Sequence, residues 1–76
     1  EASAMTEVEK TDVPILYIHG EGDTFVPTEM AEELFQQTAS HAELFLVPDA
    51  NHGESFAVAG DAYLKKVDLF LDRMID

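Results

Sequence analysis

Two short apolar runs place the tightest limit on how this chain can fold. They are Ile-Leu-Tyr-Ile at residues 15–18 and Leu-Phe-Leu-Val at residues 44–47. Neither run alternates with polar residues, and both contain β-branched and aromatic side chains. Such runs are typical of strands that are covered on both faces, as they are in a parallel sheet.

Helical patterns flank and separate the two expected strands. We expect a short helix over residues 3–10, a second helix after Pro27 and Thr28, and a last helix over residues 61–75 with Asp61 as its cap. The apolar residues of the last helix recur at helical spacing: Tyr63, Leu64, Val67, Phe70, Leu71 and Met74. Because strands alternate with helices, the sequence predicts an α/β fold with two parallel strands, in the order helix, strand, helix, strand, helix.

The length of the chain conflicts with the burial that these strands need. A chain of 76 residues is short, and chains of about this size bury only ~60% of their unfolded surface. The sequence contains no cysteine, so no disulfide can add stability. Three helices cannot cover both faces of two apolar strands. We therefore expect the sheet to be incomplete without a further, N-terminal part.

The charge of the chain argues against polyanionic partners. Sixteen acidic residues against four basic ones give a formal net charge of −12, while the apolar content of 46% is that of a globular protein. Phosphate binding requires a basic surface, so we expect no nucleic-acid partner and see no sign of membrane contact. The simplest interpretation of the charge is a solvated acidic surface that favours solubility.

Asp23 and His52 are the candidate catalytic residues. Each follows one of the two predicted strands, and the carboxyl ends of parallel strands lie at the same edge of a sheet, where ligands usually bind. A carboxylate beside an imidazole fixes the ring tautomer, so that the free ring nitrogen can move a proton. Two alternatives stay open: Asp23 only stabilises a turn, or Asp49, which we interpret as a solvated turn residue, is the partner of His52.

Two longer segments resemble the α/β-hydrolase superfamily. Residues 13–27, VPILYIHGEGDTFVP, resemble the strand and acid loop of these enzymes, and residues 43–53, ELFLVPDANHG, resemble the final strand and the loop of the catalytic histidine. The order acid then histidine also agrees with that fold. The resemblance implies that residues 1–76 are the C-terminal portion of an α/β-hydrolase domain, similar to serine esterases, lysophospholipases and dienelactone hydrolases. It implies Asp23 as triad acid, His52 as triad base, a small-molecule ester as substrate and no cofactor.

One element of that family is absent from the sequence. The nucleophile motif G-x-S-x-G does not occur, since none of Ser3, Ser40 and Ser55 has this setting, and the oxyanion loop is also missing. The chain alone is therefore expected to be inactive, and to self-associate or to pair with the rest of its parent chain. Two alternatives remain: a non-catalytic α/β interaction or assembly module with relic Asp and His, or a related triad hydrolase with a different nucleophile.

The other histidines are interpreted as structural. His19 ends the first strand, where its ring is expected to pack, and His41 is expected at the surface between a helix and a strand. The spacing of the three histidines matches no metal-binding motif, so no metal site is expected. Ser55 is interpreted as a helix-capping or loop hydroxyl.

Overall fold

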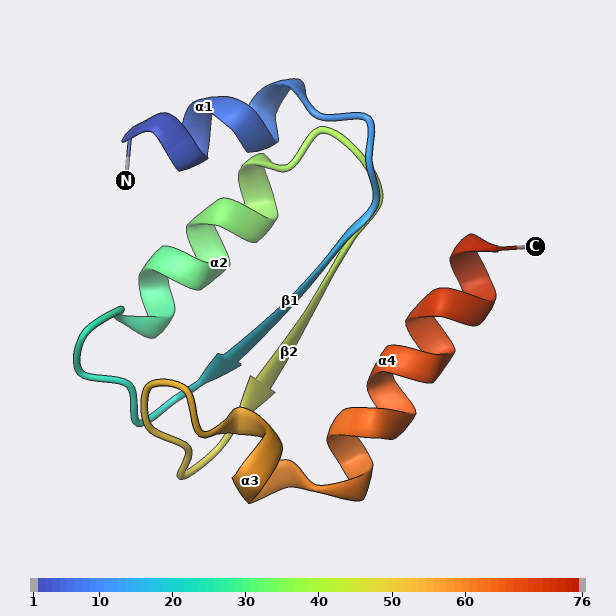
Figure 1. The fold of residues 1–76 in the computed structure, drawn as a ribbon. Helices are drawn as coiled ribbons and strands as arrows, with labels where there is room; N and C mark the ends of the chain where they lie inside the picture. Colours follow the sequence, from blue (N-terminus) through green and yellow to red (C-terminus); the bar gives the residue numbers. More distant parts are fainter. Residues whose placement is uncertain (1, 76) are drawn as a thin grey trace.

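The expected alternation of helices and strands is present in the computed structural model, which describes residues 2–75, with side chains from Met5 onward (Figure 1). The elements are α1 (Ala2–Lys10), β1 (Ile15–Gly20), α2 (Thr28–Gln37), β2 (Ala42–Val47), α3 (Ser55–Ala59) and α4 (Asp61–Met74). Both strands extend about two residues beyond the apolar runs, and α3 is an additional short helix that the sequence pattern did not predict.

The two strands form a parallel pair. β1 and β2 are in register from Ile15 opposite Ala42 to Gly20 opposite Val47, and α2 lies in the connection between them. The prediction of an α/β fold with two parallel strands is confirmed. Because both strands run in the same direction, the loops that follow them leave from one edge of the pair.

Helices lie on both sides of the strand pair. Figure 1 shows α1 and α2 on one side and α3 and α4 on the other. The hydroxyl groups of Tyr17 in β1 and Thr38 at the end of α2 share a hydrogen bond of 2.6 Å. On the opposite face, Glu43 of β2 binds Lys66 and Arg73 of α4. Tyr17 lies opposite Leu44, the neighbour of Glu43, and neighbouring strand residues point to opposite faces. The strand pair is therefore bonded to α2 on one face and to α4 on the other.

The core is small and the sheet is incomplete. Within the described part of the chain, the buried apolar residues are Ala31, Val47, Ala50 and Phe70. Most strand residues are only half-buried, and β1 has a neighbour on one edge alone. Several large apolar side chains on α3 and α4 remain exposed: Phe56, Val58, Leu64, Leu69 and Leu71. The expectation of an unfinished sheet is therefore confirmed.

The start of α4 differs from the prediction. Gly60 precedes this helix, has a φ of 56°, and no side chain caps the first turn. Asp61 is the first residue of the helix rather than its cap, in the first turn where the helix dipole favours a negative charge. No helix within residues 2–75 is both long and apolar enough to cross a membrane.

Candidate active site

The loops after β1 and β2 are joined by backbone hydrogen bonds. We call residues 21–26 the acid loop and residues 48–53 the histidine loop. The N–H of Glu21 donates to the carbonyl of Val47 (2.9 Å), and the N–H of Gly22 donates to that of Ala50 (2.8 Å). The backbones approach so closely that a Cβ at Gly20 would lie 2.3 Å from the carbonyl oxygen of Ala50. Glycine at position 20 thus permits the contact between the two loops.

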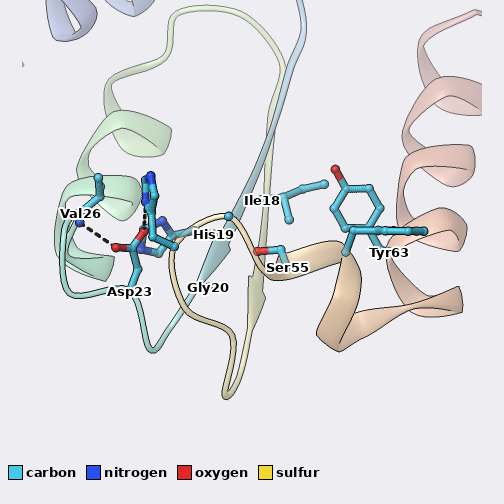
Figure 2. A pocket seen from close by; sticks show the side chains of 10 residues that line it. Ile18, His19, Gly20, Asp23, Val26, Ser55 and Tyr63 are labelled. Atoms are coloured by element: carbon cyan, nitrogen blue, oxygen red, sulfur yellow. Dashed lines mark hydrogen bonds and ion pairs between the residues drawn. The ribbon is translucent and has the colours of Figure 1, made fainter.

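Asp23 is held by its own loop. Its Oδ1 accepts hydrogen bonds from the backbone N–H groups of Phe25 (2.8 Å) and Val26 (2.9 Å). Its own N–H donates to the carbonyl of Gly20 (3.1 Å), which closes the turn after β1. The side chain is only 5% exposed. The other carboxylate oxygen, Oδ2, is left to face the histidine loop (Figure 2).

His52 meets Asp23 across 29 positions of sequence. Its Nδ1–H donates to Asp23 Oδ2 at 2.8 Å, while the imidazole remains 56% exposed. Within residues 5–75, the second ring nitrogen, Nε2, makes no hydrogen bond. The pair therefore has an oriented ring with one nitrogen free, as a proton-transferring histidine requires.

The surroundings of Asp23 favour its charged form. Burial raises the pKa of this carboxyl, but the hydrogen bonds from the Val26 N–H, the His52 ring and the Phe25 N–H outweigh that effect and lower the pKa to about 2. Asp23 is consequently ionised at neutral pH. An ionised carboxylate on Nδ1 can stabilise the imidazolium that forms when Nε2 takes up a proton.

A hollow of about 320 Å³ lies beside this pair. Asp23 and His52 line it together with apolar side chains from β1, the acid loop and α3, namely Ile18, Val26 and Phe56. Figure 2 shows Asp23, Val26 and Ile18 around the hollow. Phe56 lies on α3, which the sequence pattern did not predict, so this wall of the site was missed. A short apolar stretch after His52, Phe-Ala-Val-Ala at residues 56–59, was the available signal.

The other candidate residues make no hydrogen bond to the pair, although His19 lines the same hollow. Asp49 is an exposed turn residue with a φ of 64° and makes no hydrogen bond to His52. His19 is 9% exposed, and no described residue bonds its buried Nε2, so the ring is held by packing alone. His41 is exposed and its Nε2 contacts Glu43 at 2.8 Å. Among the described side chains, no three His, Asp or Glu residues form a group that could hold a metal.

The described serines do not form a nucleophile site. Ser40 donates its hydroxyl to the carbonyl of Val13 at 2.5 Å. Ser55 is the first residue of α3 and lines the hollow, but it makes no hydrogen bond to His52. The side chain of Ser3 lies outside the described part of the chain.

A second carboxylate cluster, which we call the Glu43 cluster, joins β2 to α4. Glu43, 12% exposed, accepts hydrogen bonds from Nε and Nη2 of Arg73, from Lys66 (3.1 Å) and from His41 (2.8 Å). The hydrogen bond from Arg73, followed by those from His41 and Lys66, holds the pKa of Glu43 far below its usual range. Sequence reasoning missed this cluster. Its signal was the seven-residue spacing of Lys66 and Arg73, which places both on one helix face.

Comparisons with known proteins are consistent with this geometry. The model of a family described as TAP-like protein, an α/β-hydrolase family, matches residues 1–73. The chain is 29% identical over 76 residues to the uncharacterized protein YqkD of Bacillus subtilis (strain 168). This alignment covers all of the chain and 25% of YqkD. It is 33% identical over 64 residues to the uncharacterized protein YfhR of Escherichia coli (strain K12). This alignment covers 82% of the chain and 22% of YfhR. The chain thus spans about a quarter of the length of these relatives.

Proposed function

Because this chain belongs to the TAP-like protein family of α/β-hydrolases, we propose that it forms the C-terminal part of a serine hydrolase that cleaves carboxylic esters. The observation that carries the proposal is the hydrogen bond between Asp23 Oδ2 and His52 Nδ1, with Nε2 left free. In this proposal Asp23 is the triad acid and His52 is the triad base. The nucleophile and the oxyanion donors belong to a part of the protein outside these 76 residues.

The proposed reaction uses His52 twice. Its Nε2 accepts the proton of the serine hydroxyl as the oxygen attacks the ester carbonyl, and the resulting imidazolium is stabilised by Asp23. The imidazolium then returns the proton to the leaving alcohol, which departs as the acyl-enzyme forms. Water repeats the sequence to release the acid. No cofactor enters this proposed chemistry, and we expect the isolated chain to be inactive.

The local support of Asp23 favours this role over that of a simple turn residue. A turn needs only the contact of Oδ1 with the N–H groups of Phe25 and Val26. The same two bonds fix the carboxylate plane, so that Oδ2 is directed at the imidazole. A residue that only closed the turn would not need to meet a histidine 29 positions away.

The test requires the complete protein that contains residues 1–76. His52→Ala and Asp23→Asn should each lower kcat/KM for 4-nitrophenyl acetate by a factor on the order of 10⁴, because the base is removed or left in the wrong tautomer. His41→Ala is the matched control, since His41 is also bonded to a carboxylate, and Asp49→Asn tests the rival acid. Both controls should stay within a few-fold of the wild type. Full activity in His52→Ala would refute the proposal.

We also propose that the uncovered edge of β1 pairs with a further parallel strand of the parent protein. The unfinished sheet and the four-fold greater length of the relatives support this assignment. The 76-residue chain alone should therefore self-associate or bind the remainder of the protein. Sedimentation velocity at low micromolar concentration provides the measurement, and a well-folded monomer would contradict the assignment.

A further inference from the structure

Phe25 is an exposed apolar side chain next to the candidate base, His52. It is 80% exposed, the largest exposed fraction among the large apolar side chains that the structure describes. Its backbone cannot shift freely, because its N–H donates to Asp23 Oδ1. The backbone that carries the ring is therefore tied to the same carboxylate that orients His52.

The ring of Phe25 lies against the imidazole of His52. The two centroids are 5.5 Å apart and the planes are inclined by 74°, an edge-to-face contact. This contact covers little of the Phe25 ring, as its high exposure shows. Phe25 does not line the hollow, so it offers His52 a second apolar surface, separate from the walls formed by Ile18 and Phe56.

We infer that Phe25 determines substrate specificity by contacting an apolar group of the ester, which rests on the function proposed above. Because the Phe25 ring contacts the imidazole, part of a substrate that reaches His52 can lie against this ring, and burying the ring from water is favourable. The preferred substrates are then neutral esters that carry an alkyl or aryl group of several carbons. The net charge of −12 acts in the same direction, because it disfavours anionic esters.

The apolar group can belong to the acyl side or to the alcohol side, and two ester series separate these cases. Ethyl acetate serves as the common reference, ethyl hexanoate extends the acyl group, and hexyl acetate extends the alcohol. In the complete protein, Phe25→Ala should lower kcat/KM for one of the longer esters relative to ethyl acetate by about ten-fold, the scale of lost apolar contacts. Phe25→Leu should retain most of the preference.

Val13→Ala is the matched control, because Val13 is also an exposed apolar residue, 60% exposed, but lies before the opposite end of β1. It should leave the ratio of the two esters unchanged. An unchanged ratio in Phe25→Ala overturns the inference. So does an equal loss on short and long esters, which would assign Phe25 to folding or to the support of His52.

A binding measurement separates this inference from the proposed function. If His52→Ala keeps its activity, the proposed function fails, yet hexanol binding can still be followed through the imidazole proton resonances of His52 in the otherwise unaltered protein. Phe25→Ala should raise the Kd for hexanol about ten-fold, by the same loss of apolar contact. An equal Kd in both proteins would overturn the role of Phe25, whatever reaction the protein catalyses.

Discussion

Two carboxylates in this chain have a histidine at the same distance. Asp23 meets His52 and Glu43 meets His41, each at 2.8 Å, and both carboxylates are largely shielded from water. They differ in their remaining partners. Glu43 also binds two permanent cations of α4, whereas the remaining bonds of Asp23 come from backbone N–H groups.

The difference lies in how the oxygens of each carboxylate are shared among their partners. Glu43 shares its two carboxylate oxygens among Arg73, Lys66 and His41. In Asp23, two backbone N–H groups occupy Oδ1, and Oδ2 is left to His52. A short distance between histidine and carboxylate therefore does not identify a catalytic pair. Under the function proposed above, the other bonds of the carboxylate are what separate Asp23–His52 from Glu43–His41.

The largest effect should come from Gly20→Ala, which separates the two loops while leaving the Glu43 cluster intact. The added Cβ would meet the carbonyl oxygen of Ala50 at 2.3 Å, and backbone cannot yield easily, so the variant should lose about 1–3 kcal/mol of stability together with the Asp23–His52 hydrogen bond. Denaturant unfolding and ester hydrolysis of the complete protein measure both. Gly22→Ala is the milder control, because its closest contact, 2.9 Å, is with the side-chain oxygen of Asn51, and the Ala50 carbonyl oxygen is farther away, at 3.1 Å.

Glu43→Gln should also lower stability, but it should leave ester hydrolysis in place. It leaves Lys66 and Arg73 without their carboxylate, so the melting temperature should fall by several degrees while ester hydrolysis persists. Glu33→Gln, at an exposed position of α2, provides the control and should melt like the wild type. If Glu43→Gln abolished hydrolysis without destabilising the fold, the distinction between the two clusters would be wrong.

Acid should weaken the contribution of Asp23 in a predictable pH window. Folding lowers the pKa of Asp23 from 3.8 to about 2, so its contribution to stability is complete above the unfolded value and is lost as the pH falls through the folded one. Urea unfolding at about pH 5 and about pH 3 should therefore differ less in Asp23→Asn than in the wild type. An unchanged difference would mean that the carboxylate is not stabilised by folding.

His41→Gln should have the smallest effect. Glu43 keeps both cations, and His41 lies at the surface, so the free energy of unfolding should change by no more than about 0.5 kcal/mol. Thermal unfolding of the variant beside the wild type is sufficient. A change several times larger would show that His41 contributes to the Glu43 cluster as strongly as its cations do.

The sequence predicted the features that depend on local pattern. The apolar runs at residues 15–18 and 44–47 predicted both strands, and their parallel direction predicted that Asp23 and His52 would meet at one edge. The resemblance to α/β-hydrolases agrees with the family match over residues 1–73.

Features that depend on helix orientation were not predictable in this way. The short helix α3 ends at Gly60, whose positive φ turns the chain into α4 and makes Gly60, not Asp61, the residue before that helix. The Glu43 cluster exists only because this turn brings Lys66 and Arg73 over β2. A pattern along the sequence indicates that α4 is a helix, but not which strand residue its basic side chains will reach.

The register of the strand pair determines how the two loops are aligned. Gly20 lies opposite Val47, and the bonded loops leave directly from that pair. A slip of one residue would displace one loop along the other by ~3.3 Å, more than the length of the hydrogen bond between Asp23 and His52. The strand register therefore also sets the alignment of His52 with Asp23. A mutation that shifts the register would therefore pull the imidazole away from its carboxylate.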